Sequence, residues 1–420
     1  MNKKIIPLLT VVMLVISACA IGQTATPTST TPAEPTASSP TAESPTAVPA
    51  MGSIVPLLEQ LGGAPCEENP DFTCVAIQVP LDHFDAANTE TIEVVFAVLP
   101  AYGERYGMFL QAFPGGPGGE GISTGFAGFH APEIEEHYDI VFFDQRGVGL
   151  SNPLQCPQAY AADFLDYLTE VDLGGEEGYD LPEEQQDAID DARVFVDGCV
   201  EEIGAQAANL AFYGTDQVAE DIESFRQVVG DEKFMFYGVS YGTSVVQHYA
   251  AVYPQHLSGM VLDGTLDLTL TGEQSAFSQE AAFDKVLVAT LQACNADEAC
   301  YADMGGDVLA AYDDLAARAS ANPIAYEFPL PDGSKVAREF TFNQLEYTTA
   351  YQMYSLSGRM LFLRALAAAV KGDMVPLARL QYQQLTMDPE TYTYLGDPTF
   401  NDTMFLGVLC TDDSYFSGTT

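Results

Sequence analysis

Short apolar runs alternate with amphipathic stretches through the middle of the chain. Strands are predicted where runs of β-branched and aromatic residues end in Gly-rich or polar turns, and helices where apolar positions recur every three or four residues. The predicted strands are residues 74–79, 91–100, 108–113, 139–143, 234–237 and 259–263. Because strands and helices alternate, we expect an α/β fold with a doubly wound, mostly parallel sheet behind a leading hairpin.

The helix before the fifth of these strands has a clear amphipathic pattern. Its apolar positions form one stripe, and Thr215 is predicted to cap its N-terminus. The stripe consists of Val218, Ile222, Phe225 and Val229. We therefore expect this helix to pack against the sheet.

Beyond Gly264 the strand pattern stops and the sequence becomes mainly helical, with Ala-rich stretches. We expect residues 271–402 to form a helical lid inserted into the sheet domain. Its aromatic and methionine side chains pack between helices in the favoured interpretation and line a substrate pocket in the alternative. These side chains are Tyr347, Tyr351, Met353 and Tyr354.

Composition completes the predicted domain organisation. Residues 20–50 are almost wholly Thr, Pro, Ser and Ala, a composition that cannot bury a core and is typical of a tether. The predicted parts are a signal peptide at 1–19, this linker at 20–50, an α/β core at 51–270, the lid at 271–402 and the start of a return to the core at 403–420.

The N-terminus has the pattern of a secretory signal. Lys3 and Lys4 precede an apolar run, residues 5–16, that is too short to span a bilayer. The segment ending at Cys19 resembles the lipobox of bacterial lipoproteins, which implies a lipidated Cys19 and a protein held at the outer cell surface. The alternative is ordinary cleavage after Ala20, which would give a secreted protein.

The charge balance narrows the range of partners. Lys and Arg number 15 against 60 Asp and Glu, for a net charge of −45. Such a chain is repelled by nucleic acid and by anionic membranes, so we expect no nucleic-acid partner and no membrane contact beyond the lipid anchor. The acidic surface is interpreted as a solvated one, and attraction of cationic substrates such as free amino termini is the alternative.

The chain has eight cysteines, which in an exported protein indicate disulfides. We expect local bridges Cys66–Cys74 and Cys294–Cys300, a third bridge Cys156–Cys199, and an unpaired Cys410. The sequence lacks a Cys-x-x-Cys motif and a pair of histidines at metal spacing. We therefore predict no metal site and no cofactor.

The candidate chemistry centres on Gly238-Val239-Ser240-Tyr241-Gly242, which lies between a predicted buried strand and a predicted helix. This context indicates a nucleophile elbow, the sharp turn that exposes a catalytic serine. Ser240 is then the nucleophile, and the oxyanion would be bound by the backbone N–H of Tyr241 and by that of Gly116 in the Gly-rich segment 114–119. The alternatives are a chance turn and a Gly-rich loop with a purely steric role.

A base for Ser240 is difficult to find. In this kind of site the acid and the histidine follow the serine in the chain. His248 and His256 follow it but lie along and beyond the helix that leaves the elbow, and His130 is only a remote candidate. Asp263 is a possible acid, with a structural role favoured. We therefore expect the acid and the histidine to lie beyond residue 420, in a sheet truncated before its last strands, and poor hydrolysis by this chain.

Three motifs in order carry a family resemblance. They are Gly115-Gly116-Pro117-Gly118, Asp144-x-Arg146-Gly147-x-Gly149-x-Ser151, and Gly238-x-Ser240-Tyr241-Gly242-Thr243. Together they resemble the α/β-hydrolase-fold prolyl and tripeptidyl aminopeptidases over residues 74–265. Leu409-Cys410-Thr411-Asp412 is similar to the stretch where exported tripeptidyl members return to the sheet. Asp144 and Arg146 are expected to hold their loop by hydrogen bonds and an ion pair.

The resemblance implies a serine exopeptidase that forms an acyl-enzyme and releases short peptides from free amino termini. Pro114 stands where many prolyl members have His, so the tripeptidyl branch is favoured. Lid carboxylates would bind the substrate ammonium group, and Glu273, Glu280 and Asp284 are the candidates. The alternatives are an esterase or lipase on the same fold and a surface-tethered binding protein that lacks the base.

Overall fold

The computed structural model describes residues 53–112, 115–128, 131–169, 182–230 and 233–412. The predicted signal peptide with Cys19, the linker at 20–50, Pro114 and His130 lie outside the described residues. So do residues 413–420 of the predicted return segment. None of the described helices is both long enough and apolar enough to cross a membrane.

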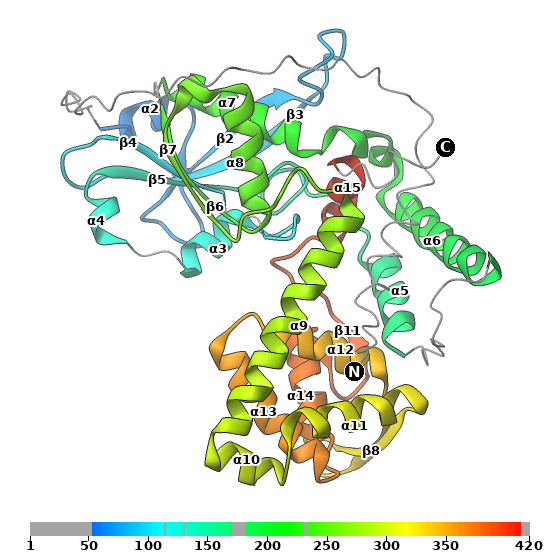
Figure 1. The fold of residues 1–420 in the computed structure, drawn as a ribbon. Helices are drawn as coiled ribbons and strands as arrows, with labels where there is room; N and C mark the ends of the chain where they lie inside the picture. Colours follow the sequence, from blue (N-terminus) through cyan, green and yellow to red (C-terminus); the bar gives the residue numbers. More distant parts are fainter. Residues whose placement is uncertain (1–52, 113–114, 129–130, 170–181, 231–232, 413–420) are drawn as a thin grey trace.

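A mixed sheet of seven strands forms the body that carries the predicted motifs (Figure 1). Its order is β1-β2-β3-β5-β4-β6-β7; β3 is antiparallel to β2 and β5, whereas β5, β4, β6 and β7 are mutually parallel. The strands are β1 (Ala64–Pro65), β2 (Thr73–Pro80), β3 (Thr91–Leu99), β4 (Gly107–Ala112), β5 (Tyr138–Phe143), β6 (Phe234–Val239) and β7 (Leu257–Asp263). The predicted α/β fold and leading hairpin are confirmed.

The two faces of the sheet are covered by different helices. Side chains alternate between faces along a strand, so Phe143 and Phe142 belong to different apolar clusters. On one face α7 (Thr215–Val229) and α8 (Tyr241–Val252) cover β3, β4 and β6. On the other, α3 (Gly121–Gly128) and α4 (Pro132–Glu135) lie against β5. The residues of β4, and those of β5 after Tyr138, are buried on both faces of the sheet.

Helix α7 buries the predicted apolar stripe, as the spacing of Val218, Ile222, Phe225 and Val229 indicated. The prediction that Thr215 caps this helix is wrong. Gly214 occupies the cap position and has no side chain to offer, and the Thr215 N–H instead donates to the Asp412 carboxylate at 2.8 Å. The cap is thus supplied by a residue far away in the sequence.

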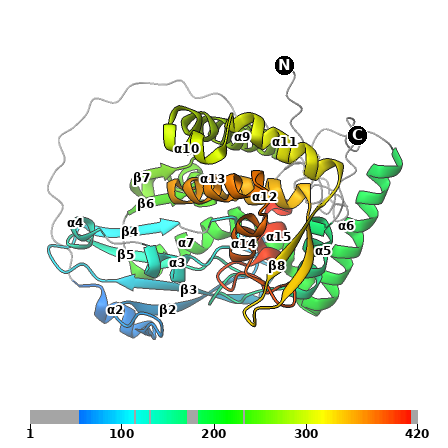
Figure 2. The same ribbon diagram turned by 90° about the horizontal axis from the view of Figure 1, so that it is seen from below.

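The lid is a second body, joined to the sheet by the long helix α9 (Figure 1). Seen from below, α13 and α12 lie between α9 with α11 on one side and α14 with β8 on the other (Figure 2). Its helices are α9 (Gly272–Ala296), α10 (Glu298–Met304), α11 (Val308–Ala321), α12 (Phe342–Gln352), α13 (Leu356–Val370) and α14 (Val375–Gln384). They share an apolar core of their own.

The lid contains strands that the sequence pattern did not indicate. β8 (Ile324–Pro329) and β9 (Lys335–Phe340) form an antiparallel hairpin, and β10 (Met387–Asp388) pairs with β11 (Thr393–Tyr394). Phe328 and Phe340 of the hairpin are buried in the lid core. The hairpin therefore packs into the lid and not against the main sheet.

The excursion between β5 and α7 also contributes to the lid. It forms α5 (Pro157–Thr169), α6 (Pro182–Ile203) and the 3-10 helix η1 (Gly204–Phe212). Phe164 and Leu168 of α5 belong to the apolar core of the lid. The chain finally returns to the sheet body through α15 (Asp402–Asp412), which contacts both α5 and η1.

The three predicted disulfides are present: Cys66–Cys74, Cys156–Cys199 and Cys294–Cys300. Cys410 is disulfide-bonded as well, so the prediction of an unpaired Cys410 is wrong. Among the described residues β7 pairs with β6 alone, and its Met260 is 48% exposed.

Arg146 provides the first test of this fold. It is fully buried, and its guanidinium bonds the Asp221 carboxylate at 2.6 and 2.8 Å and the carbonyl oxygens of Leu81 and Phe212. Arg146→Met should lower the free energy of unfolding by about 3 kcal/mol, because the buried Asp221 carboxylate loses the guanidinium and keeps the contact with the His83 imidazole. Urea unfolding measures this loss. The exposed Arg193→Met is the control, and equal effects of the two changes would contradict the prediction.

Candidate active site

The predicted strand-to-helix turn at Ser240 is present. β6 ends at Val239, α8 begins at Tyr241, and Ser240 between them has φ 52° and ψ −123°. A non-glycine residue with such a backbone is strained, and this strain is characteristic of a serine at a nucleophile elbow. The Ser240 N–H donates to the Asp263 carbonyl at 2.9 Å, which ties the turn to the end of β7. The Ser240 residue is exposed at this edge of the sheet.

Two glycines make this turn possible. A Cβ on Gly242 would lie 1.9 Å from the carbonyl oxygen of Ala112 at the end of β4, and one on Gly238 would lie 2.6 Å from the Gly242 carbonyl oxygen. No side chain fits at either position without moving backbone. The Gly-x-Ser-x-Gly spacing is therefore a requirement of how closely α8 approaches β4 and β6.

Tyr241 follows the serine and begins α8. Its side chain is buried, and its hydroxyl lies 2.5 Å from the Thr215 hydroxyl. The Thr215 hydroxyl in turn donates to Asp412. At the first position of a helix, the Tyr241 N–H has no carbonyl acceptor within the helix and is free to face a ligand beside Ser240.

Gly116, the second predicted oxyanion donor, lies in the segment that links β4 to α3. It is exposed and has φ 111°, in the region that favours glycine. A Cβ at this position would lie 2.8 Å from the Phe400 ring. β4 and β6 are adjacent and parallel, so the loop after β4 and the elbow after β6 lie at the same edge of the sheet.

Asp144 and Arg146 hold the neighbouring turn. The Asp144 carboxylate accepts the Ile122 N–H at 3.0 Å and the Leu150 N–H at 2.9 Å, and thereby anchors the start of α3, which follows the Gly-rich loop. Arg146 is paired with Asp221. Both contacts agree with the structural role expected from the sequence.

The described histidines have partners away from Ser240. His83 contacts Asp221, His137 contacts the Glu104 carbonyl, His248 contacts Ser244, and His256 contacts Glu223. The Asp263 carboxylate accepts the Tyr237 hydroxyl at 3.0 Å. In the described part of the chain, no histidine is hydrogen-bonded to either Ser240 or Asp263, which supports the structural interpretation of Asp263.

Two of the three candidate lid carboxylates, Glu280 and Asp284, differ in their surroundings. The Glu280 side chain is 8% exposed, its Oε1 has no hydrogen-bond partner among the described residues, and burial raises its pKa. Asp284, one turn further along α9, is half-buried. Nothing is described of the Glu273 side chain. The sequence alone did not separate these three, because burial depends on the packing of α9.

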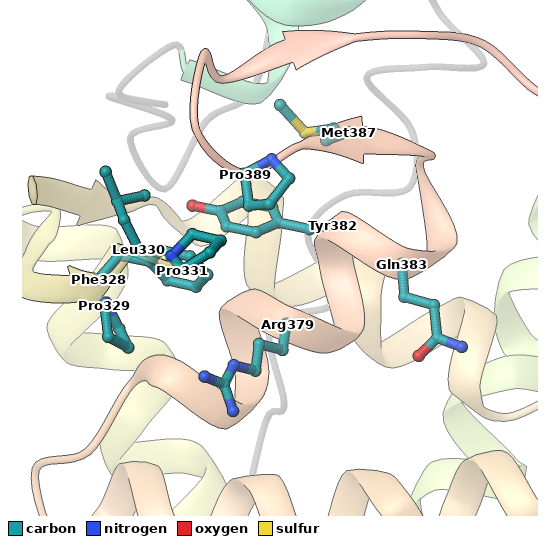
Figure 3. A pocket seen from close by; sticks show the side chains of 9 residues that line it. All are labelled: Phe328, Pro329, Leu330, Pro331, Arg379, Tyr382, Gln383, Met387 and Pro389. Carbon is teal, nitrogen blue, oxygen red and sulfur yellow. The ribbon is translucent and has the colours of Figure 1, made fainter. Parts of the chain in front are cut away.

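A pocket of about 450 Å³ lies elsewhere in the lid, between the β8–β9 hairpin and α14 (Figure 3). Its walls include Phe328, Pro331, Tyr382 and Arg379 and contain no residue of the elbow or the Gly-rich loop. No group of three side chains suited to a metal ion occurs within the described ranges.

Comparison with known proteins agrees with this geometry. A family model described as alpha/beta hydrolase fold matches residues 112–293, which include the elbow and the Gly-rich loop. Together with the strand order, the match shows that the chain contains an α/β-hydrolase-fold domain.

Named relatives of the chain include hydrolases of two kinds. Serine protease Hip1 of Mycobacterium tuberculosis is 33% identical over 197 residues, 46% of this chain and 36% of that protein. Tripeptidyl aminopeptidase of Streptomyces lividans is 30% identical over 169 residues, 39% of this chain and 29% of that protein. Carboxylesterase B of M. tuberculosis is 32% identical over 239 residues, 54% and 42% of the two chains. The resemblance to serine peptidases of this fold is confirmed, over less than half the length of each relative.

Gly242→Ala tests the close approach of α8 to β4. The added methyl group overlaps the Ala112 carbonyl oxygen, so the elbow must move, and we expect the free energy of unfolding to fall by about 3 kcal/mol. The control is Gly198→Ala inside α6, where the new Cβ would have an ordinary contact of 3.4 Å. Chemical denaturation compares the two variants. An unchanged midpoint for Gly242→Ala would refute the steric argument.

Three buried aspartates predict that the stability of the protein depends on pH. Burial raises the pKa of Asp144, Asp402 and Asp412 to about 6. Their contribution to stability is therefore fully present below the unfolded pKa of about 4 and is lost as pH rises through 6. We expect Tm to be higher at pH 5 than at pH 7.5.

The variant Asp402→Asn separates this effect from the general repulsion of the acidic chain. The Tyr394 hydroxyl contacts Asp402 at 3.3 Å and can also accept a hydrogen bond from an amide. Tm should then change less between pH 5 and 7.5 than in the parent protein. A decrease in the Tm of the parent protein from pH 7.5 to pH 5 would contradict the raised pKa values of these aspartates.

Proposed function

We propose that the protein is a serine aminopeptidase that releases short peptides from free amino termini through an acyl-enzyme on Ser240. The strained elbow and the two backbone donors beside it support acyl transfer. The similarity to the tripeptidyl aminopeptidase of Streptomyces lividans supports the tripeptidyl branch. We also propose that the protein acts outside the cell.

The reaction follows from the roles of these groups. The Ser240 hydroxyl oxygen attacks the carbonyl carbon of the scissile peptide bond while a base removes its proton. The negative oxygen of the tetrahedral intermediate is bound by the N–H groups of Tyr241 and Gly116. The leaving amine takes the proton from the base, and water then releases the peptide from Ser240. The base is not one of the histidines described above, so this role is assigned to a residue outside the described ranges.

The observation that carries the exopeptidase proposal is Glu280. Burying a carboxylate without a cation is costly, and a carboxyl retained in this state is suited to a ligand that brings the positive charge. The lid helix α9, which carries Glu280, starts nine residues after the end of β7, at the sheet edge where Ser240 lies. An ammonium group bound at Glu280 would fix the distance from the amino terminus to the cleaved bond, as a tripeptidyl enzyme requires.

An esterase is the second candidate, favoured by the similarity to carboxylesterase B. The elbow and oxyanion donors serve both reactions equally well. The choice of substrate distinguishes the esterase from the aminopeptidase, because an ester has no ammonium group for a lid carboxylate to bind.

The test uses the full-length protein and three fluorogenic substrate sets: tripeptides with a free amino terminus, the same peptides acetylated, and short-chain esters. The proposal expects turnover of the free peptides and little of the acetylated ones, with all turnover lost in Ser240→Ala. Equal turnover of free and acetylated peptides would exclude an aminopeptidase, and turnover of esters alone would favour the second candidate.

Glu280→Gln tests the ammonium site directly. It removes the negative charge with little change of shape, so KM for free tripeptides should rise about tenfold, which corresponds to the loss of roughly 1.4 kcal/mol of binding. Turnover of esters should not change. Asp284→Asn on the same helix is the matched control, and equal effects of both variants on KM would contradict a specific role for Glu280.

A further inference from the structure

The segment that returns from the lid to the sheet, residues 399–412, contacts both halves of the predicted oxyanion site. Its first part pairs with the Gly-rich loop. The Glu120 N–H donates to the Thr399 carbonyl at 2.9 Å, the Asn401 N–H donates to the Gly118 carbonyl at 2.8 Å, and Gly119 and Phe400 form an antiparallel bridge. The loop that carries Gly116 is thus paired, through residues 118–120, with a segment nearly three hundred residues later.

Asn401 anchors this pairing. The residue is 4% exposed and its side chain is fully used: the amide nitrogen donates to the carbonyls of Gly147 and Leu154 at 2.9 and 2.8 Å, and the amide oxygen accepts the Met404 N–H at 3.1 Å. Asn401 therefore fixes three segments together: the Gly-rich loop, the turn after β5 and the start of α15. An aspartate could not replace it, because a carboxylate has no donor for the two carbonyls.

The other end of the segment reaches the second donor. α15 ends at Asp412, which accepts both the N–H and the hydroxyl of Thr215. The Thr215 hydroxyl contacts the hydroxyl of Tyr241, whose side chain is 3% exposed. Thr215 is therefore placed by Asp412, and Tyr241 is held by Thr215. One helix of eleven residues connects the anchor of Gly116 to the anchor of Tyr241.

We propose that residues 399–412 act as a clamp that sets the positions of both oxyanion donors, with Asn401, Asp412 and Thr215 as positioning residues. These residues do not touch the substrate. They hold the backbone N–H groups of Gly116 and Tyr241 at a fixed separation, which an oxyanion site needs because its donors must be in place before charge develops. The clamp also makes the lid and the donors one unit, since the same segment is the lid's return to the sheet.

The first experiment measures amide hydrogen exchange of the ligand-free protein by mass spectrometry. Asn401→Ala should speed exchange in peptides covering residues 115–122 at least tenfold. Thr215→Val keeps the shape of the side chain. It should speed exchange in residues 240–246 and leave exchange in residues 115–122 unchanged. Asn343→Ala is the control, because Asn343 is an equally buried asparagine in lid helix α12. Exchange that rises no more than in the control would overturn the clamp.

The second experiment uses turnover and rests on the proposed function. Asn401→Ala and Thr215→Val should lower kcat about tenfold or more with KM within twofold, because the donors bind the transition state and not the substrate. Asp412→Asn keeps an acceptor for the Thr215 N–H and should retain more kcat than Asp412→Ala. A rise in KM alone would overturn the positioning role. So would an unchanged kcat in a variant whose loops exchange hydrogen faster than those of the parent protein. If the protein turns over no peptide, the proposed function is wrong, and the clamp is then tested by the hydrogen-exchange experiment alone.

Discussion

The close approach of α8 to the end of β4 is the constraint on which the rest of the site depends. Gly242 lies so near the Ala112 carbonyl oxygen that no larger residue fits, and this allows the chain to turn from β6 into α8 within one residue. The turn strains Ser240 and leaves it exposed, while the first N–H groups of α8 have no helical acceptor. A single steric fact thus places a nucleophile beside a donor. The strain at Ser240 is maintained because β4, β6 and β7 hold both ends of the turn.

Local patterns made the elbow, the strands and the short-range disulfides predictable from the sequence. Each depends on residues within about ten positions of one another, or on side chains that alternate along one element. The bridge Cys156–Cys199 spans 43 residues and was expected because it would close a helical excursion of the chain. The turn around Ser240 needs glycines at fixed spacing, and such a requirement is visible in the sequence itself.

The errors arose where distant residues supply the partner. Thr215 was interpreted as a cap because its side chain type is common there, but Asp412 performs that role from nearly two hundred residues away. The β8–β9 hairpin lies in a mainly helical region, and its burial depends on the lid core that surrounds it. The lid carboxylates were equivalent in the sequence, and packing distinguishes Glu280 from Asp284. Asn401 belongs to no recognisable sequence motif, because its role depends on the three segments that it joins in the folded protein.

The anchors of the sheet body and those around the site differ in chemistry. In the body, buried carboxylates are paired with cations: Asp221 with Arg146, Asp139 with Arg105 and Glu223 with Arg226. Around the site, Asp144 and Asp412 accept hydrogen bonds from neutral groups, and burial raises the pKa of both to about 6. With 15 Lys and Arg against 60 acidic residues, cations cannot supply every buried contact. Protonation near neutral pH therefore acts first on the segments that hold the oxyanion donors, while the ion-paired sheet beneath them keeps its contacts.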